Sequence, residues 1–273
     1  MTLKLVIMSD LHLVPEGEIS NTLDTAERLR QAVDSVNARH ADADMVILAG
    51  DLADLGEADA YVRLPDLIAP LTMDTHLMLG NHDDRPTFLK VFGDGYADEN
   101  GFVQKVVDTK GFRIIMLDST EPGLVGGRIC DSRLAWLQAR LDEAKDRPVI
   151  VVLHHHVAKL QMPVDRIRLE DPEKLLAVLK THPDIRHVIS GHVHITTTGS
   201  WQGVPFTTIA GGHYSAKLHL ESAPGHVKLV DGPGQYAVVL VDDEACLVHF
   251  ENFIDGHYEI HRENFGRLRA NRR

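Results

Sequence analysis

Five short apolar segments of this 273-residue chain each end in a cluster of aspartate, asparagine or histidine side chains. The clusters are Asp10-Leu11-His12, Gly50-Asp51, Gly80-Asn81-His82-Asp83, His154-His155-His156 and Gly191-His192-Val193-His194. In open α/β sheets, ligands bind at the carboxyl ends of the strands. If the five segments are strands of one parallel sheet, all five clusters meet at the same edge. No other feature of the sequence constrains the fold as strongly.

Segments with helical spacing alternate with the apolar ones. Residues 22–40 place apolar side chains on one helical face, and residues 57–64 predict a helix that Pro65 ends. Residues 131–145 predict an amphipathic helix capped by Asp131 or Ser132, and residues 171–182 predict another. This alternation predicts an α/β domain. The apolar segments after residue 204 lack intervening helices and predict a second, mixed sheet packed against the first.

The residue types in the five clusters indicate which ions they suit. Carboxylates, imidazoles and one amide, without a thiolate, favour Mn²⁺, Fe, Zn²⁺ or Co²⁺. Seven candidate ligands are too many for one tetrahedral ion, but they suit two ions that share a bridging carboxylate. The pair His192 and His194 raises a geometric question, since alternate residues of an extended strand point to opposite faces. Both serve one site if the chain turns after Gly191, or if two ions lie side by side.

Composition limits the possible partners. The formal net charge is −12, from 28 Lys+Arg against 40 Asp+Glu, whereas nucleic-acid binders usually have a basic surface. We therefore expect no nucleic-acid polymer as partner. No apolar run approaches the ~20 residues of a membrane helix, and Asp10 interrupts the N-terminal segment too early for a signal peptide. We expect a cytoplasmic protein without a membrane partner.

We expect one domain over residues 1–273, because no linker, repeat or low-complexity segment divides the chain. The metal motifs fall in residues 1–200, and the C-terminal strands and tail in 201–273. The polar, basic tail 262–273 predicts a frayed end. Cys130 and Cys246 are far apart and match no metal-binding or redox spacing. The apolar strands after Pro205 leave a homo-oligomer possible.

In this order, the motifs D-x-H, G-D, G-N-H-D, H and G-H-x-H resemble those of the calcineurin-like metallophosphoesterase superfamily. They extend from Asp10 to His194. The stretches "LHHH" and "LAWLQARL" are most similar to the bacterial class III cyclic-nucleotide phosphodiesterases and the related glycerophosphodiesterases. The resemblance implies a four-layer α-β-β-α sandwich of two mixed sheets flanked by helices.

The resemblance also implies a role for each ligand. The first metal would be held by Asp10, His12 and His194, the second by Asn81, His154 and His192, and Asp51 would bridge them. It assigns His155 and His156 to neither metal. Relatives often have proline soon after the His154 position, but the first proline here is Pro163. The loop that shapes the substrate pocket therefore differs from the family pattern.

The implied activity is hydrolysis of a small phosphodiester by attack of a metal-bound hydroxide on phosphorus. A cyclic nucleotide, 3′,5′ or 2′,3′, is the first candidate substrate, and a glycerophosphodiester is the alternative. A phosphomonoesterase or a nuclease fits less well. His82 would bind the phosphate or protonate the leaving oxygen, and Asp83 would orient His82. His213 resembles a histidine that lines the substrate pocket of some relatives. The charge-rich residues 164–174 predict a solvated loop before a helix, with contact of Arg166 or Arg168 with an anionic substrate as the alternative.

Two readings from other functional classes compete with a hydrolase. A scaffold that has lost its metals predicts broken ligands, but all seven ligand positions are intact. A single-metal oxidoreductase or binding protein does not need seven ligands or an asparagine among them. Both alternatives therefore explain less of the sequence than a dinuclear phosphodiesterase.

Overall fold

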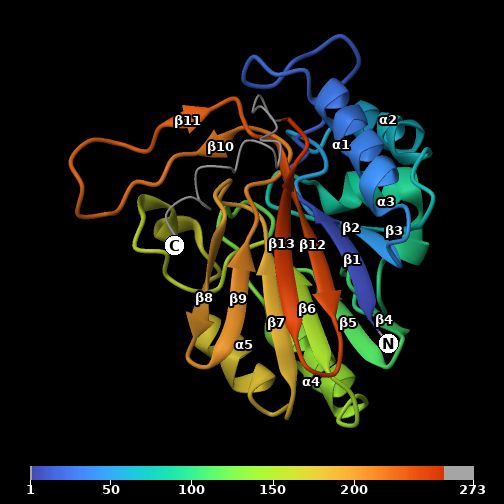
Figure 1. The fold of residues 1–273 in the computed structure, drawn as a ribbon, viewed down its shortest axis with the longest axis vertical. Coiled ribbons are helices and arrows are strands. Elements are labelled where there is room, and N and C mark those ends of the chain that lie inside the picture. Colours follow the sequence, from blue (N-terminus) through green and yellow to red (C-terminus); the bar gives the residue numbers. More distant parts are fainter. Residues whose placement is uncertain (1, 255–273) are drawn as a thin grey trace, which may run out of the picture.

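The two large sheets of the described chain pack face to face (Figure 1). The computed structural model describes residues 2–254. The first sheet has the order β13 (Cys246–Asn252), β12 (Gln235–Val241), β1 (Leu3–Met8), β2 (Met45–Ala49) and β3 (Asp74–Met78). The second has the order β4 (Lys105–Thr109), β5 (Phe112–Leu117), β6 (Val149–Leu153), β7 (Ile185–Ser190), β9 (Val204–Thr208) and β8 (Thr197–Trp201).

Both sheets are mixed. Strands β1, β2 and β3 are parallel, and β12 and β13 join them antiparallel. In the second sheet β5, β6, β7 and β9 are parallel, with β4 and β8 antiparallel at the edges. The assumption of one parallel sheet is therefore wrong. Three of the polar clusters follow strands of the first sheet, whereas the other two follow β6 and β7 of the second.

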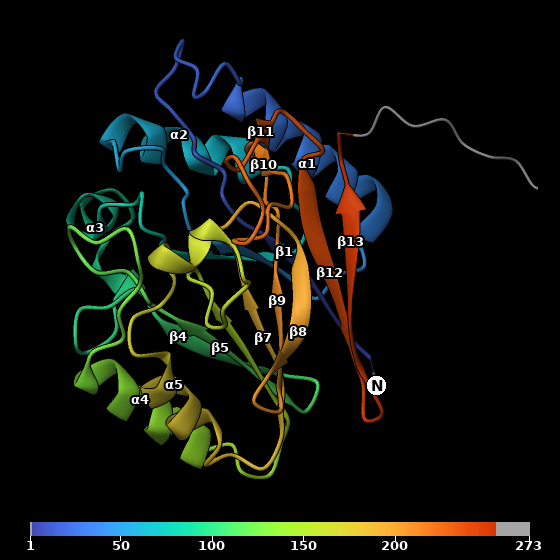
Figure 2. The same cartoon turned by 90° about the vertical axis from the view of Figure 1, so that its left-hand side faces the viewer.

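Helices cover the outer face of each sheet (Figure 2). Helices α1 (Thr25–His40), α2 (Ala58–Ile68) and α3 (Arg85–Phe92) lie on the first sheet, and α4 (Asp131–Asp142) and α5 (Pro172–Leu179) on the second. Two 3₁₀ turns, Asp94–Tyr96 and Pro163–Ile167, and a short ribbon of β10 (Ser215–Ala216) and β11 (Leu229–Val230) complete the elements. The predicted four-layer arrangement is confirmed.

Three apolar cores separate the four layers, and strand alternation distributes side chains among them. Leu5 and Ile7 of β1 lie in the core between the sheets, whereas Val6 faces the helices. In β6, Ile150 lies between the sheets and Val151 faces α4 and α5. A strand covered on both faces needs apolar residues at every position. This burial explains why the central strands appear in the sequence as unbroken apolar runs.

Two helix boundaries differ from expectation. Helix α2 continues through Pro65 to Ile68, although proline removes one helical hydrogen bond. Tyr61 and Leu64 are fully buried, and the amide of Ala69 donates to the Pro65 carbonyl at 2.9 Å, so packing outweighs the lost bond. Helix α4 begins after Cys130, and no side chain caps it.

The C-terminal tail 262–273 lies outside the described residues. Within residues 2–254, every helix is too short or too polar to cross a bilayer.

A buried histidine of β7 makes stability depend on pH. The Nε2 atom of His187 shares a hydrogen bond of 2.8 Å with the Thr207 hydroxyl of β9, and burial lowers the pKa of His187 from 6.5 to about 4. Between these two pH values the unfolded chain binds a proton that the folded protein does not. His187→Gln should therefore reduce the slope of unfolding free energy against pH by up to about 1.4 kcal/mol per pH unit, the value for one full proton.

Urea unfolding of wild type and His187→Gln from pH 7 to pH 5 measures this slope. Stability of the wild type falls as pH falls through this window, because the unfolded state takes up the extra proton. His249→Gln, at an exposed position of β13, is the matched control. Equal slopes for His187→Gln and wild type would contradict the assignment.

Candidate metal centre

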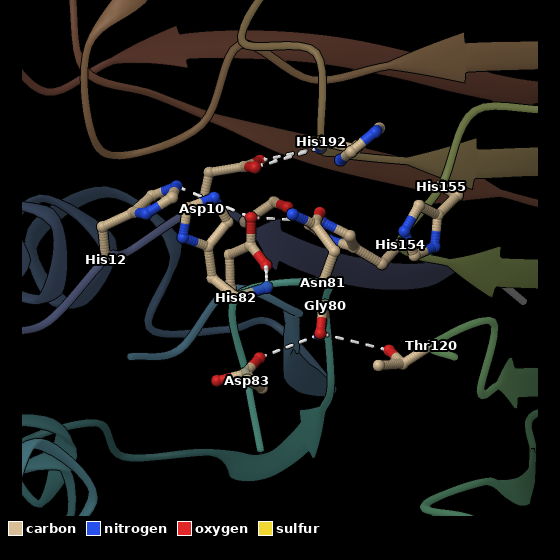
Figure 3. A network of polar contacts seen from close by, with 12 residues as sticks. Asp10, His12, Gly80, Asn81, His82, Asp83, Thr120, His154, His155 and His192 are labelled. Atoms are coloured by element: carbon tan, nitrogen blue, oxygen red, sulfur yellow. Dashed lines mark hydrogen bonds and ion pairs between the residues drawn. The ribbon is translucent and has the colours of Figure 1, made fainter. Parts of the chain in front are cut away.

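The five polar clusters converge where the carboxyl ends of the two sheets meet (Figure 3). The clusters after β1, β2 and β3 come from one side, and those after β6 and β7 from the other. Cross-sheet contacts join them, since His194 Nε2 lies 3.5 Å from Asp10 Oδ1 and His154 Nε2 lies 3.2 Å from Asn81 Oδ1. The structure thus brings all seven expected ligands together, although they come from two sheets.

The backbone leaves the extended conformation at most of these positions. Five of the seven have positive φ: Asp10 (55°), His12 (45°), Asp51 (51°), His192 (73°) and His194 (52°). This left-handed region costs a non-glycine residue about 1–3 kcal/mol, and Asp, Asn and His occupy it more readily than other side chains. The His-x-His question therefore has a structural answer. The chain turns after Gly191, so both imidazoles point into the site.

Two glycines allow the clusters to approach one another. A Cβ on Gly80 would lie 2.2 Å from Asp51 Oδ1 and 2.7 Å from His154 Nε2. A Cβ on Gly191 would lie 1.8 Å from the Ser9 hydroxyl oxygen. Neither glycine is needed for a positive φ. Both are instead required because any side chain would occupy the space between the ligands.

The Asp51 carboxylate occupies the middle of the site. Its Oδ2 lies 3.3 Å from His154 Nε2 and 3.6 Å from His12 Nε2. Its Oδ1 accepts a hydrogen bond of 2.9 Å from the backbone amide of His82. One carboxylate oxygen between imidazoles of two different sheets has the placement that a bridging ligand needs.

Each of four imidazoles has one ring nitrogen tied to an oxygen, which leaves the other nitrogen toward the site. The pairs are His12 Nδ1 with Asp54 Oδ1, His154 Nδ1 with the Ala49 carbonyl, His194 Nδ1 with the Tyr214 carbonyl and His192 Nε2 with the Ile167 carbonyl, all at 2.9 Å. Such oxygen partners fix the tautomer of metal-binding histidines. His12 Nε2 is buried and has no hydrogen-bond partner among residues 2–254.

Buried charges dominate the electrostatics of the site. Burial alone would lower the pKa of His154, but the adjacent Asp51 carboxylate outweighs burial and raises the pKa to about 9. Burial would raise the pKa of Asp51, whereas His154 and His12 hold it well below its usual range. Burial, together with the neighbouring His155 and His154, holds the pKa of His192 well below normal. The carboxylates at this site therefore require nearby positive charge.

The donor atoms fit two adjacent cations. Three groups have ligand atoms within 4.8 Å of one another: His12, Asp51 and His82; Asp51, His154 and His192; His12, His194 and His213. Asp51 belongs to two of these groups, as a shared ligand would. The donors are nitrogen and oxygen atoms only, which excludes a soft thiolate site.

The structure corrects the expected role of Asp83. Its buried carboxylate accepts from the amides of Leu52, Ala53 and Gly80 at 2.8–3.1 Å and from the Tyr61 hydroxyl at 2.9 Å. No hydrogen bond joins Asp83 to His82 within residues 2–254. His82 Nδ1 instead donates to the Asp54 carbonyl at 2.6 Å. Asp83 therefore ties the loop after β2 to the loop after β3, and Asp54 orients His82.

Asp54 and Tyr214 are site residues that sequence reasoning missed. Asp54 contacts His12 through its side chain and His82 through its carbonyl. Tyr214 accepts from His194 through its carbonyl, and its ring stacks on the His194 ring at 4.0 Å. Asp54 lies three residues after Asp51, which is a weak signal on its own. Nothing in the sequence near Tyr214 indicates its role.

The remaining histidines of the clusters are buried. His155 exchanges a hydrogen bond of 2.8 Å with the Ser119 hydroxyl, and His156 lies 3.9 Å from Asp165. Both, and His213, have no measurable exposure. His213 therefore does not lie on an open surface, and its expected place in the substrate pocket stays a prediction. Arg166, but not Arg168, lines a pocket of about 170 Å³ next to His192 and His194.

Substitution of Gly80 tests whether the space between the ligands holds metal. In Gly80→Ala the new methyl group overlaps Asp51 Oδ1 and His154 Nε2, so we expect the metal content after Mn²⁺ loading to fall from two ions per chain to one or none. Gly95→Ala is the matched control, since nothing lies within 4 Å of a Cβ there. Elemental analysis measures the metal content, and circular dichroism checks folding. Two ions in folded Gly80→Ala would contradict this geometry.

Comparison with known proteins agrees with the geometry. The family model described as "Calcineurin-like phosphoesterase" matches residues 3–196. A "probable cyclic nucleotide phosphodiesterase" from Rhodopseudomonas palustris is 35% identical over 256 residues, covering 92% of this chain and 93% of the relative. The "3′,5′-cyclic adenosine monophosphate phosphodiesterase CpdA" of Pseudomonas aeruginosa is 32% identical, with 70% and 69% covered.

A second group of relatives bears on the alternative substrate. A "probable glycerophosphodiester phosphodiesterase GpdQ" from Arcobacter nitrofigilis is 24% identical, with 94% of this chain and 97% of the relative covered. Among solved structures, a dimetal phosphatase from Danio rerio superposes with a TM-score of 0.66 at 18% identity, over 93% of this chain and 97% of that one. That likeness concerns the fold. With the motifs, the sandwich and the family match in agreement, this chain belongs to the calcineurin-like phosphoesterase family.

Proposed function

We propose that this protein hydrolyses a small phosphodiester, with a cyclic nucleotide as first candidate, at a site that holds two divalent ions. The observation that carries the proposal is the position of Asp51, whose Oδ2 lies within 3.6 Å of imidazoles from both sheets. A carboxylate in this position suits two ions ~3.5–4 Å apart, a spacing used for displacement at phosphorus.

The proposed ligand sets are those that the family motifs imply. Asp10, His12 and His194 would hold the first ion, Asn81, His154 and His192 the second, and Asp51 both. The contacts of His194 with Asp10 and of His154 with Asn81 support this division. The oxygen and nitrogen donors suit Mn²⁺, Fe, Zn²⁺ or Co²⁺. When bound, the ions would neutralise the non-bridging phosphate oxygens and lower the pKa of a bound water.

His82 is placed to move the proton that the leaving group needs. Its Nδ1 donates to the Asp54 carbonyl, so Nε2 carries a proton only in the imidazolium form, and that form can donate to a substrate. The ring is only partly buried and lies 4.5 Å from the His12 ring. His82 therefore adjoins the ligands but stays accessible, as a general acid must. We propose that Nε2 protonates the departing alkoxide.

A pocket of about 170 Å³ adjoins the ligands His192 and His194. Its other walls include Pro163, Val164 and Arg166 of the 3₁₀ turn, with Tyr214 and Leu229 near the β10–β11 ribbon. The walls are mainly apolar and carry one cation. Such a pocket suits the organic group of an anionic diester.

A cyclic nucleotide is preferred because relatives over 30% identical carry that name. A glycerophosphodiester remains the second candidate because a relative named for it matches nearly the whole chain. We further propose a cytoplasmic protein that acts on small molecules and not on nucleic-acid polymers. Homo-oligomer formation remains a prediction.

Activity on a panel of substrates tests the reaction class. With Mn²⁺ we expect turnover of 3′,5′- or 2′,3′-cyclic AMP and of bis(p-nitrophenyl) phosphate, and weaker turnover of p-nitrophenyl phosphate. A glycerophosphodiester in the same panel decides between the two candidates. Asp51→Ala removes the shared ligand and should abolish turnover of every diester, with Asp243→Ala on an exposed turn as control. Wild-type activity in Asp51→Ala would exclude the bridging role.

Leaving groups of different basicity test His82. An alkoxide needs a proton as it departs, whereas p-nitrophenolate does not. His82→Gln should therefore lower kcat for a cyclic nucleotide by about 10²–10⁴-fold and change kcat for bis(p-nitrophenyl) phosphate much less. Metal content should stay at two ions per chain. An equal loss on both substrates would argue against proton transfer by His82.

A further inference from the structure

We infer that His213 is an additional protein ligand of the first ion, through its Nδ1 atom. The inference rests on the proposed dinuclear centre and adds to it a residue from the loop after β9. The family motifs reach only to His194, so His213 lies outside them.

The position of the ring carries the inference. A ring nitrogen of His213 lies within 4.8 Å of ligand atoms of both His12 and His194. The His213 ring stacks on the His12 ring, with centroids 4.5 Å apart and 30° between the planes. His12 and His194 are the two imidazoles assigned to the first ion. A cation bound by these two would therefore have a third imidazole beside it.

The hydrogen bonds of His213 follow the rule of the other ligand histidines. Its Nε2 faces the Ser20 carbonyl at 3.4 Å, a long contact. Its Nδ1 is buried and has no hydrogen-bond partner among residues 2–254. A buried ring nitrogen without a partner is costly in a folded protein. Coordination of a cation by this lone pair would remove that cost.

The burial of His213 favours a metal-ligand role over contact with substrate. His213 has 0% exposure, and it does not belong to the walls of the pocket beside His192 and His194, although its neighbour Tyr214 does. His155 also has a buried ring nitrogen without a partner in the described chain. His155, however, belongs to none of the groups of converging ligand atoms. Burial and convergence together single out His213.

The loop that carries His213 is held firmly in place. Arg28 of α1 donates to the carbonyls of Gly212, His213 and Asp231 at 2.6–2.9 Å, and its side chain is mostly buried. The amide of Gly212 donates to the Ser9 carbonyl at 2.9 Å. A loop tied both to α1 and to the end of β1 keeps His213 in register with His12.

The first ion would then have more protein donors than the second. Asp10, His12, Asp51, His194 and His213 would surround the first, whereas Asp51, Asn81, His154 and His192 would surround the second. Loss of the His213 side chain should lower the binding affinity for the first ion and leave the affinity for the second ion unchanged. Because His213 stacks on His12, a purely structural role would affect the same ion, and the distance from His213 Nδ1 to the bound ion separates the two roles.

Metal titration tests the inference without any measurement of activity. Co²⁺ is added to metal-free wild type and His213→Ala, followed by visible absorption and by competition with a chelator. We expect one of two sites in His213→Ala to lose at least about tenfold in affinity, with an altered absorption band for that site only. His226→Ala, exposed on the segment between β10 and β11, is the control. Equal affinities at both sites in folded His213→Ala would overturn the inference.

A crystal structure of the wild type grown with Zn²⁺ keeps the test decisive if the variant fails to fold. We expect an ion about 2.0–2.1 Å from His213 Nδ1. An ion bound by His12 and His194 but beyond bonding distance of His213 would overturn this inference alone. Wild-type protein that binds no ion would overturn the proposed function as well.

Discussion

The contact of Asp51 with imidazoles from both sheets organises the molecule. An unpaired carboxylate at full burial is strongly unfavourable, and Asp51 is 1% exposed. Its partners His12 and His154 follow strands of opposite sheets. The sheets must therefore approach closely at this end, and the chain meets that demand with glycine at Gly80 and Gly191 and with left-handed backbone at five ligand positions. The left-handed backbone and the two glycines both allow the loops of the two sheets to come close together at Asp51.

Hydrogen bonds in the surrounding loops hold the proposed ligand side chains in fixed positions. Asp83 ties three backbone amides together, Asp54 orients both His12 and His82, and Arg28 holds the loop after β9. None of these three side chains belongs to the proposed ligand set. Their common effect is to fix ring orientation before any ion binds, which lowers the entropic cost of assembling a site.

The strand-end motifs were sufficient for the family, and the resemblance they carry implied the four layers. The convergence of the motifs was expected on one parallel sheet, whereas it occurs between two. The sequence could not assign strands to sheets. A strand buried on both faces has no alternation that reveals its neighbours, so β2 and β6 look alike although they lie in different sheets. Pro65 ended the predicted α2 because the packing of Tyr61 and Leu64 is a tertiary effect. Asp83 seemed suited to orient His82 only because the two are adjacent in sequence, whereas the side chain also accepts from the amides of Leu52 and Ala53, which are 31 and 30 residues away.

The core between the sheets has a role beyond stability. Each proposed ion takes ligands from both sheets, so the distance between the sheets sets the distance between the ligand halves. That distance depends on the volume of side chains such as Ile7, Ile47 and Ile150, which meet in this core. Apolar residues between the sheets thus set the distance between the proposed ligands of one sheet and those of the other. Evolution can adjust the geometry of such a site by single methylene groups, without touching a ligand.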